Sequence, residues 1–115
     1  MKTLKNCIKL SSSVKIYVPS TIDVNKDFDN SVWVDATMKL LSQCFGGSTA
    51  SLALGAWVSS AGQLVKEDVT LVFAYAEQSQ LETNIEMIYN FCLDMKTKLG
   101  QEAIALEVNN ELYLV

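Results

Sequence analysis

Hydrophobic and polar residues alternate in several short stretches of the chain, and this period of two predicts β-strands. Residues 14–18 alternate in this way and are β-branched, and Pro19, which lacks an N–H group, ends the stretch. Further strands are predicted over residues 52–58, 64–75, 103–108 and 112–115. A loop containing Gly62 joins one pair and a two-residue turn at Asn109-Asn110 joins another, so we expect two hairpins.

A first amphipathic helix is predicted near residues 30–45, where the hydrophobic positions form a broad apolar face. Either Asn30 or Ser31 can cap its start with a side-chain oxygen. The G-G pair at 46–47 provides a left-handed stop. The G-G-S-T run at 46–49 follows a helix and lacks a lysine, so it indicates a turn and not a phosphate loop.

A second helix is predicted near residues 79–99, where Ser79 and Glu82 match the spacing of a capping box. One apolar stripe with spacings of four and three runs along it and predicts packing against a core. The stripe consists of Leu81, Ile85, Ile88, Cys92, Met95 and Leu99. Gly100 is expected to close the helix.

The predicted order is strand, helix, strand, strand, helix, strand, followed by one terminal strand. This is the split βαβ arrangement of the ferredoxin-like fold, which belongs to the α+β class. Because strand–helix–strand crossovers are right-handed, both helices are expected on one face of an antiparallel sheet with the order 4-1-3-2 and the last strand beside the fourth. Residues 1–13 are predicted to form a flexible N-terminal arm, and residues 14–115 a single ferredoxin-like domain.

The sheet face opposite the helices is predicted to be too apolar to remain bare. The side chains expected on that face, and therefore predicted to bind a partner, are Tyr17, Trp57, Val72, Leu112 and Leu114. A one-residue shift of the last hairpin would exchange Tyr113 for the two leucines. A second copy of the chain, forming a homodimer, is the favoured occupant; a foreign protein comes next, and stacked RNA bases come last.

The charge pattern argues against several classes of function. The chain has 13 acidic residues and 9 lysines, no arginine and no histidine, and a net charge of −4. Without arginine or a basic face, direct nucleic-acid binding is not expected. The absence of histidine removes the Ser-His and Cys-His nucleophile pairs and every histidine metal site. We therefore assign no catalytic residue, no metal ligand and no cofactor.

The cysteines are too scattered for a metal-binding or redox motif, and we expect reduced thiols. Cys44 and Cys92 fall at helical apolar positions and are predicted to lie in the core, whereas Cys7 falls in the arm. No secretory leader or stretch of membrane-spanning length is recognisable, so we expect a cytoplasmic protein.

A small polar cluster is the remaining chemical candidate. It consists of Lys66, Glu67, Gln101 and Glu102. Paired carboxylates can transfer protons, although a solvated edge or an ion pair explains the charged run at 66–68 equally simply.

Several short motifs resemble a bacterial family of unknown function with the layout T…G-x-W…G…E…Q-E. They are G-G-S-T at 46–49, G-A-W at 55–57, Gly62, K-E at 66–67 and G-Q-E at 100–102, and they cover residues 45–105. The terminal run E-A-I-A-L-E-V-N-N-E-L-Y-L-V and the early run K-I-Y-V-P-S-T are similar to small proteins carried by plasmids, conjugative elements and phages of Gram-positive bacteria.

Some proteins of that origin are anti-CRISPR factors. The resemblance therefore implies a non-enzymatic inhibitory or accessory protein of a mobile element, which acts on a type II RNA-guided nuclease or its guide RNA assembly. The alternative is a homodimeric ferredoxin-like module that binds a small ligand or another protein. A third class, an enzyme using Lys66, Glu67 and Glu102, is less favoured. The resemblance transfers no functional residue.

Overall fold

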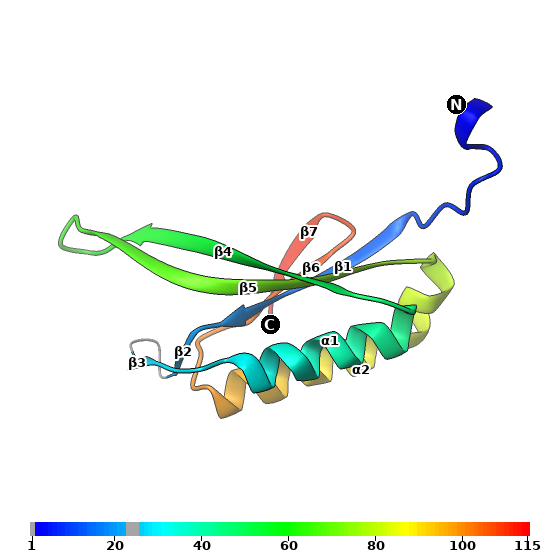
Figure 1. Cartoon of the computed structure of the whole chain (residues 1–115). Helices are drawn as coiled ribbons and strands as arrows, with labels where there is room; N and C mark the ends of the chain where they lie inside the picture. The colour runs from blue at the N-terminus through cyan, green and yellow to red at the C-terminus, as the bar shows by residue number, and fades with distance from the viewer. Residues whose placement is uncertain (1, 23–25) are drawn as a thin grey trace.

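The computed structural model describes residues 2–22 and 26–115, and it has one sheet covered on one side by two helices (Figure 1). The main elements are β1 (Ser12–Pro19), α1 (Ser31–Phe45), β4 (Thr49–Val58), β5 (Leu64–Ala76), α2 (Gln78–Lys98), β6 (Ala105–Val108) and β7 (Glu111–Leu114). Shorter elements are a 3-10 turn (Lys2–Leu4) and the two-residue strands β2 (Thr21–Ile22) and β3 (Lys26–Asp27), which pair with each other.

The strand order of the five-stranded sheet is β4-β5-β1-β6-β7, and all its pairs are antiparallel. In chain order this is 2-3-1-4 followed by the terminal strand, so the predicted ferredoxin-like topology is confirmed. The last hairpin also has the predicted turn, with φ values of 51° at Asn109 and 68° at Asn110. Positive φ at both central residues matches the twist of the flanking strands, which explains the preference for asparagine here.

The N-terminus of α1 is held by two neighbouring side chains with different partners. Asn30 occupies the cap position, but its Nδ2 donates to the carbonyl of Pro19 at 3.2 Å instead of capping the helix. The Ser31 N–H donates to Oδ1 of Asp29 at 3.0 Å. That bond favours the ionised carboxylate and lowers the pKa of Asp29.

The predicted cap of α2 was wrong by two residues. Glu77 is the cap, and its N–H donates to Oε1 of Gln80 at 3.1 Å, so a capping box forms from Glu77 and Gln80 instead of Ser79 and Glu82. A glutamate can accept a backbone N–H as serine does, but it is a rarer cap and the sequence pattern favoured serine. At the other end, Gly100 adopts φ 58° as expected.

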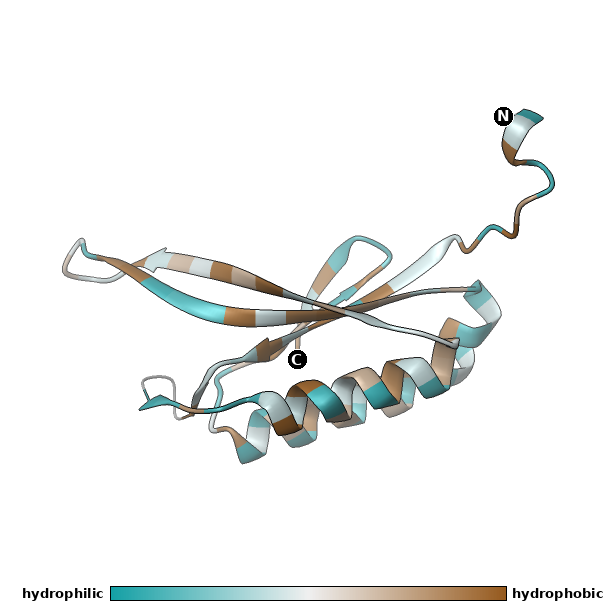
Figure 2. Ribbon diagram, viewed as in Figure 1, coloured by the Kyte–Doolittle hydropathy of each residue, from teal (hydrophilic) through white to brown (hydrophobic). Residues whose placement is uncertain are grey.

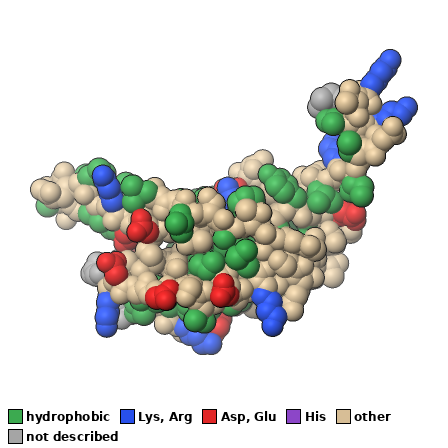
Figure 3. Space-filling model, viewed as in Figure 1, with side chains coloured by type: hydrophobic (Ala, Val, Ile, Leu, Met, Phe, Trp, Pro, Cys, Tyr) green, Lys and Arg blue, Asp and Glu red, His purple; other side chains and the backbone are tan. Residues whose placement is uncertain are grey.

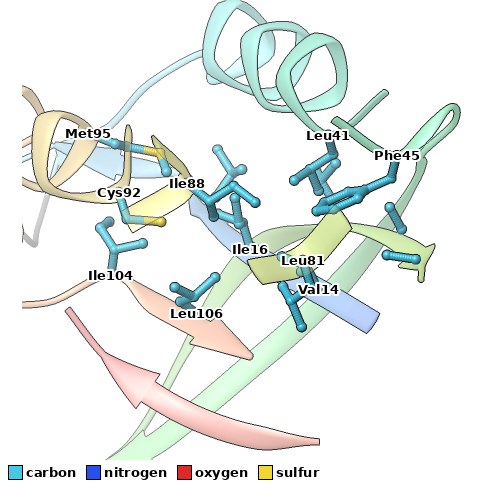
Figure 4. Packing of buried hydrophobic residues seen from close by; sticks show 14 of the residues in the cluster. Val14, Ile16, Leu41, Phe45, Leu81, Ile88, Cys92, Met95, Ile104 and Leu106 are labelled. Carbon is cyan, nitrogen blue, oxygen red and sulfur yellow. The ribbon is translucent and has the colours of Figure 1, made fainter. Parts of the chain in front are cut away.

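The core lies between the helices and the covered face of the sheet (Figure 4). Its buried members include Val14, Ile16 and Val18 from β1 and every residue of the stripe predicted for the second helix except Ile85, which is partly buried. Cys92 is buried as predicted, and burial raises the pKa of its thiol to about 12. Cys44 is half-buried at the edge of the core, and Cys7 is exposed in the arm.

The register of β5 corrects one predicted site residue. Val72 lies opposite Ile16 of β1, and neighbours directly across an antiparallel pair share a face. Val72 is therefore in the core with no exposed surface, and the prediction that it faces outward was wrong. Apolar residues occupy both faces of β5, so its alternation carried no information on which set was buried.

The first strand begins two residues earlier than expected. Ser12 is buried and donates from Oγ to Oε1 of Gln78 at 2.6 Å, and the Ser13 N–H donates to Oδ1 of Asn109 at 3.0 Å. Both residues therefore belong to the sheet and not to the arm. Residues 2–11 lie outside the packed layers and are exposed.

The two glycines after α1 provide a matched test of the helix stop. Gly46 has φ 91°, whereas Gly47 has no positive φ, and an added Cβ would touch nothing at either position. Gly46→Ala should destabilise the fold by about 1–2 kcal/mol, because an L-residue is strained in the left-handed region. Gly47→Ala should leave the free energy of unfolding nearly unchanged. Urea unfolding measures both, and equal values for the two variants would contradict this account.

Candidate functional site

We call the sheet surface opposite the helices the outer face. The strand registers place the following side chains there: Lys15, Tyr17, Ala53, Trp57, Val65, Glu67, Val69, Leu71, Phe73, Tyr75, Ala105, Glu107, Leu112 and Leu114. Of the five predicted partner-binding residues, all except Val72 lie on this face. Trp57 is 44% exposed and Leu114 72%. The predicted binding role of these residues stays a prediction.

The centre of the outer face has one compact polar group among aromatic rings. Nζ of Lys15 lies 3.6 Å from Oε2 of Glu107 and 5.9 Å from the centre of the Phe73 ring. The Tyr17 hydroxyl donates to Oε1 of Glu107 at 3.5 Å. Phe73 and Tyr75 meet edge to face at 6.4 Å. The charges neutralise each other, so this part of the face is weakly charged although it is polar.

Phe73 and Tyr75 were missed from the sequence for the same reason that Val72 was misplaced. With Val72 assigned outward, the alternate residues of the strand, which include Phe73 and Tyr75, are assigned inward. The observed register places Val72 on the covered face and Phe73 and Tyr75 on the outer face, so both assignments change together.

The hairpin of β4 and β5 extends beyond the helices and forms a projecting ribbon (Figure 1). Hydrophobic residues continue along it toward its tip (Figure 2). On its helix side, Leu52 is 86% exposed, Leu54 63% and Val58 67%, and Trp57 emerges on the outer face. A two-stranded hairpin is marginally stable alone in water, and both sides of this one carry uncovered apolar side chains.

Gly55 lies in the middle of β4, directly across from Glu67. A Cβ at this position would meet only the Glu67 carbonyl oxygen at 3.8 Å, an ordinary contact. The chain itself therefore does not require glycine there. A strand glycine often marks a place where a ligand or another backbone approaches closely. Here the glycine lies across from the half-buried Glu67 and two residues from Trp57.

The predicted polar cluster is not a single site within one chain. Lys66 pairs with Ala56 on the helix side of the ribbon, whereas Glu67 points to the outer face. Nε2 of Gln101 donates to the carbonyls of Thr21 at 2.8 Å and Leu99 at 3.0 Å, which gives it a structural role at the end of α2. Glu102 is exposed. Adjacent strand residues point to opposite faces, so the side chains of Lys66 and Glu67 leave the ribbon on opposite sides.

A hollow of about 450 Å³ lies between α2 and the last hairpin. It is apolar and is lined by Ile85, Tyr89, Leu106, Val108, Tyr113, Leu114 and Val115. No local motif in the sequence indicates it, because it depends on how far the β6–β7 hairpin stands from the helix.

Within residues 2–22 and 26–115, no group of three or more His, Cys, Asp or Glu side chains could hold a metal ion. Neither helix of that part of the chain combines the length and the hydropathy needed to cross a membrane.

No family model matches the sequence, and no curated protein sequence matches it. Similar folds occur among solved structures. A phage SAM lyase in complex with S-methyl-5′-thioadenosine has a TM-score of 0.65 at 12% identity, over 97% of this chain and 94% of that chain. The apo form of a phage SAM lyase has a TM-score of 0.62 at 14% identity, over 91% and 88%.

A Bacillus cereus protein related to NIF3 has a TM-score of 0.51 at 17% identity, and the match covers 90% of this chain but 25% of that protein. At these identities the likeness shows a shared fold and no shared activity.

Proposed function

We propose that this chain is a self-associating binding module whose outer face packs against a second copy and takes a small nucleoside ligand of the sulfonium or thioether type. The observation that carries self-association is the uncovered apolar surface on both sides of the β4–β5 ribbon. Leu52 and Trp57 point to opposite sides of this ribbon and are 86% and 44% exposed. A patch of this kind is typical of an interface.

The charges of the outer face suit a second copy of the same chain. Lys15 and Glu107 neutralise each other there, and Glu67 adds one further negative charge. Two such faces can therefore meet without bringing many like charges together, and like charges brought together at an interface are costly.

Replacing Trp57 by glutamate should weaken self-association by about tenfold or more, because a charge would be buried at the contact without a counter-ion. Sedimentation equilibrium measures the association constant, and circular dichroism checks that the variant folds. Met87→Glu is the matched control, since Met87 is 49% exposed on α2 and lies away from the outer face. A wild-type chain that stays monomeric, or equal association of both variants, would overturn the proposed interface.

The ligand class is supported by two observations. The fold is shared over nearly the full length with a phage SAM lyase solved with S-methyl-5′-thioadenosine. In this chain, the open space at Gly55 lies beside the Glu67 carboxylate and near the Trp57 indole. A carboxylate attracts a sulfonium cation, and an indole face binds both cations and flat heterocycles. S-Adenosylmethionine carries both a sulfonium cation and a flat heterocycle, its adenine ring.

Two ligands that differ in charge test this site. Glu67→Gln should weaken binding of cationic S-adenosylmethionine about tenfold, while binding of S-methyl-5′-thioadenosine, whose thioether is neutral, should change little. Gly55→Val should weaken both, because it fills the gap. Isothermal titration calorimetry measures these affinities, with Ala56→Val on the other side of the ribbon as control. Equal loss of both ligands in Glu67→Gln, or full binding by Gly55→Val, would contradict the assignment.

The prediction that the chain is not an enzyme can be tested in the same mixtures. We expect binding without conversion of S-adenosylmethionine, followed by chromatography. Conversion by the wild type that disappears in folded Glu67→Gln, with S-methyl-5′-thioadenosine still bound, would assign a catalytic role to this carboxylate.

Inhibition of a type II CRISPR nuclease is a second proposal, supported by the sequence resemblance and by the excess of 13 acidic residues over 9 lysines. An acidic protein can occupy a basic nucleic-acid channel, and charge speeds the encounter. Expression should restore phage plaquing in cells whose type II system targets that phage. Double replacement of Glu67 and Glu102 by glutamine should reduce protection partly. Absence of protection against every type II system tested would remove this role.

A further inference from the structure

The N-terminal arm, residues 2–11, has features that the fold does not use. It leaves the sheet at Ser12 and runs away from the packed layers (Figure 1). It contains three lysines and no acidic residue. Ile8 is 89% exposed, whereas Leu10 is 42% exposed and lines hollows beside Phe73 and Tyr75 of the same chain.

The arm also has the alternation of a strand. In this structure the arm begins with a turn, in which the Cys7 N–H donates to the Leu4 carbonyl at 2.9 Å. Once the arm is extended, Ile8 and Leu10 fall on one side, and Lys5, Cys7 and Lys9 fall on the other. An extended arm therefore has one apolar side and one basic side. Such a segment fits a groove with one apolar wall and one acidic wall.

The described residues form a groove of this type under the ribbon, and we call it the ribbon groove. It consists of two hollows of about 390 Å³ and about 250 Å³. The first hollow is lined by Ser20, Asp27, Phe28, Leu54, Lys66, Glu67 and Asp68, and the second by Asn30, Ser31, Val34, Asp35, Ala50, Ser51, Leu52 and Thr70. One wall is the underside of the ribbon, and the other is formed by β3 and the first turns of α1.

The two walls differ in chemistry. The ribbon wall presents Leu52 and Leu54, which are 86% and 63% exposed, and it also carries the charged residues Lys66, Glu67 and Asp68. The opposite wall presents Asp27 and Asp35, with Asp29 beside them at the start of α1. Acidic side chains are visible below the ribbon in Figure 3, and lysines lie on the arm at the other end of the molecule.

Two lysines also lie near this groove. Lys66 belongs to the ribbon wall, and Lys26 belongs to β3. The acidic residues at the groove outnumber these two cations, so its net charge is opposite to that of the arm.

The arm of the same chain is badly placed to reach the groove. Ser12, where the arm begins, pairs with Ala76, whereas the groove starts near Thr70, which pairs with Val18. Those six residues of β1 span about 20 Å at roughly 3.3 Å each. The arm would have to reverse direction at Ser12 and run back along the sheet. A second copy can present its arm without this reversal.

We propose that the ribbon groove takes the N-terminal arm of a second copy of this chain. Ile8 and Leu10 of the arm lie against Leu52 and Leu54, and its lysines face the aspartates of the opposite wall. This contact is separate from the outer-face contact, since it covers the other side of the ribbon.

Cys7 allows a direct test, because it is exposed and falls on the basic side once the arm is extended. A Cys7→Ser, Ser31→Cys chain with a size tag is mixed with the wild-type chain and treated with a short bismaleimide. Ser31 lines the acidic wall, so we expect a cross-linked heterodimer on a denaturing gel. The matched control is Cys7→Ser, Ser79→Cys, which places an exposed cysteine in the first turn of α2 and should cross-link at least tenfold less. Cys44 and Cys92 are present in both mixtures and set the background.

Charge provides a second readout in the same assay. Lys5→Glu, Lys9→Glu in the arm-donating chain should lower the yield at least tenfold, whereas Lys96→Glu, Lys98→Glu at the end of α2 should not. Equal yields at positions 31 and 79 would overturn the proposal. A Ser31→Cys chain that retains Cys7 and cross-links within itself would also overturn the proposal, because the arm in the ribbon groove would then belong to the same chain. Repeating the assay with Trp57→Glu separates this contact from the outer-face contact.

Discussion

The mismatch between strand length and helix length is the constraint on which the rest of this structure depends. The 13 residues of β5 span about 43 Å in an extended strand, whereas the 15 residues of α1 rise only about 22 Å. The helices therefore cannot cover the whole sheet. The ribbon, its exposed leucines and the groove beneath it are consequences of this difference.

Within the covered part, β1 organises the packing. Its residues Val14, Ile16 and Val18 are fully buried, and β5 and β6 pair with its two edges. Both helices pack on the same side of this strand, as right-handed crossovers require. The opposite side of the sheet has no layer of its own. The tyrosine, phenylalanine and leucine side chains of the outer face are thus available to a ligand or a second copy.

The likeness to phage SAM lyase structures concerns the fold, which does not by itself indicate an activity. Folds of two helices on an antiparallel sheet support many functions, and activity resides in particular side chains. Here the informative position is Gly55, where an added Cβ would make only an ordinary contact with the backbone of Glu67. The proposed ligand site rests on that local feature and not on the fold.

The sequence by itself determined the turns, the helix stop and the helix face that depend only on residues close together in the chain. Positive φ at Asn109 and Asn110, the stop at Gly46 and the buried stripe of α2 follow from residues within a few positions of one another. Together with the crossover rule, these features were sufficient to predict the order of the strands.

Only the tertiary structure decided which face each residue of β5 presents. Val72 is buried because it lies opposite Ile16, a partner 56 positions earlier in the chain, and the apolar alternation of β5 could not reveal that register. The same pairing placed Phe73 and Tyr75 on the outer face. The ribbon groove likewise combines residues from β3, α1 and the ribbon. Its chemistry exists only once these distant segments are packed, since a strand shifted by one residue would present the opposite set of side chains.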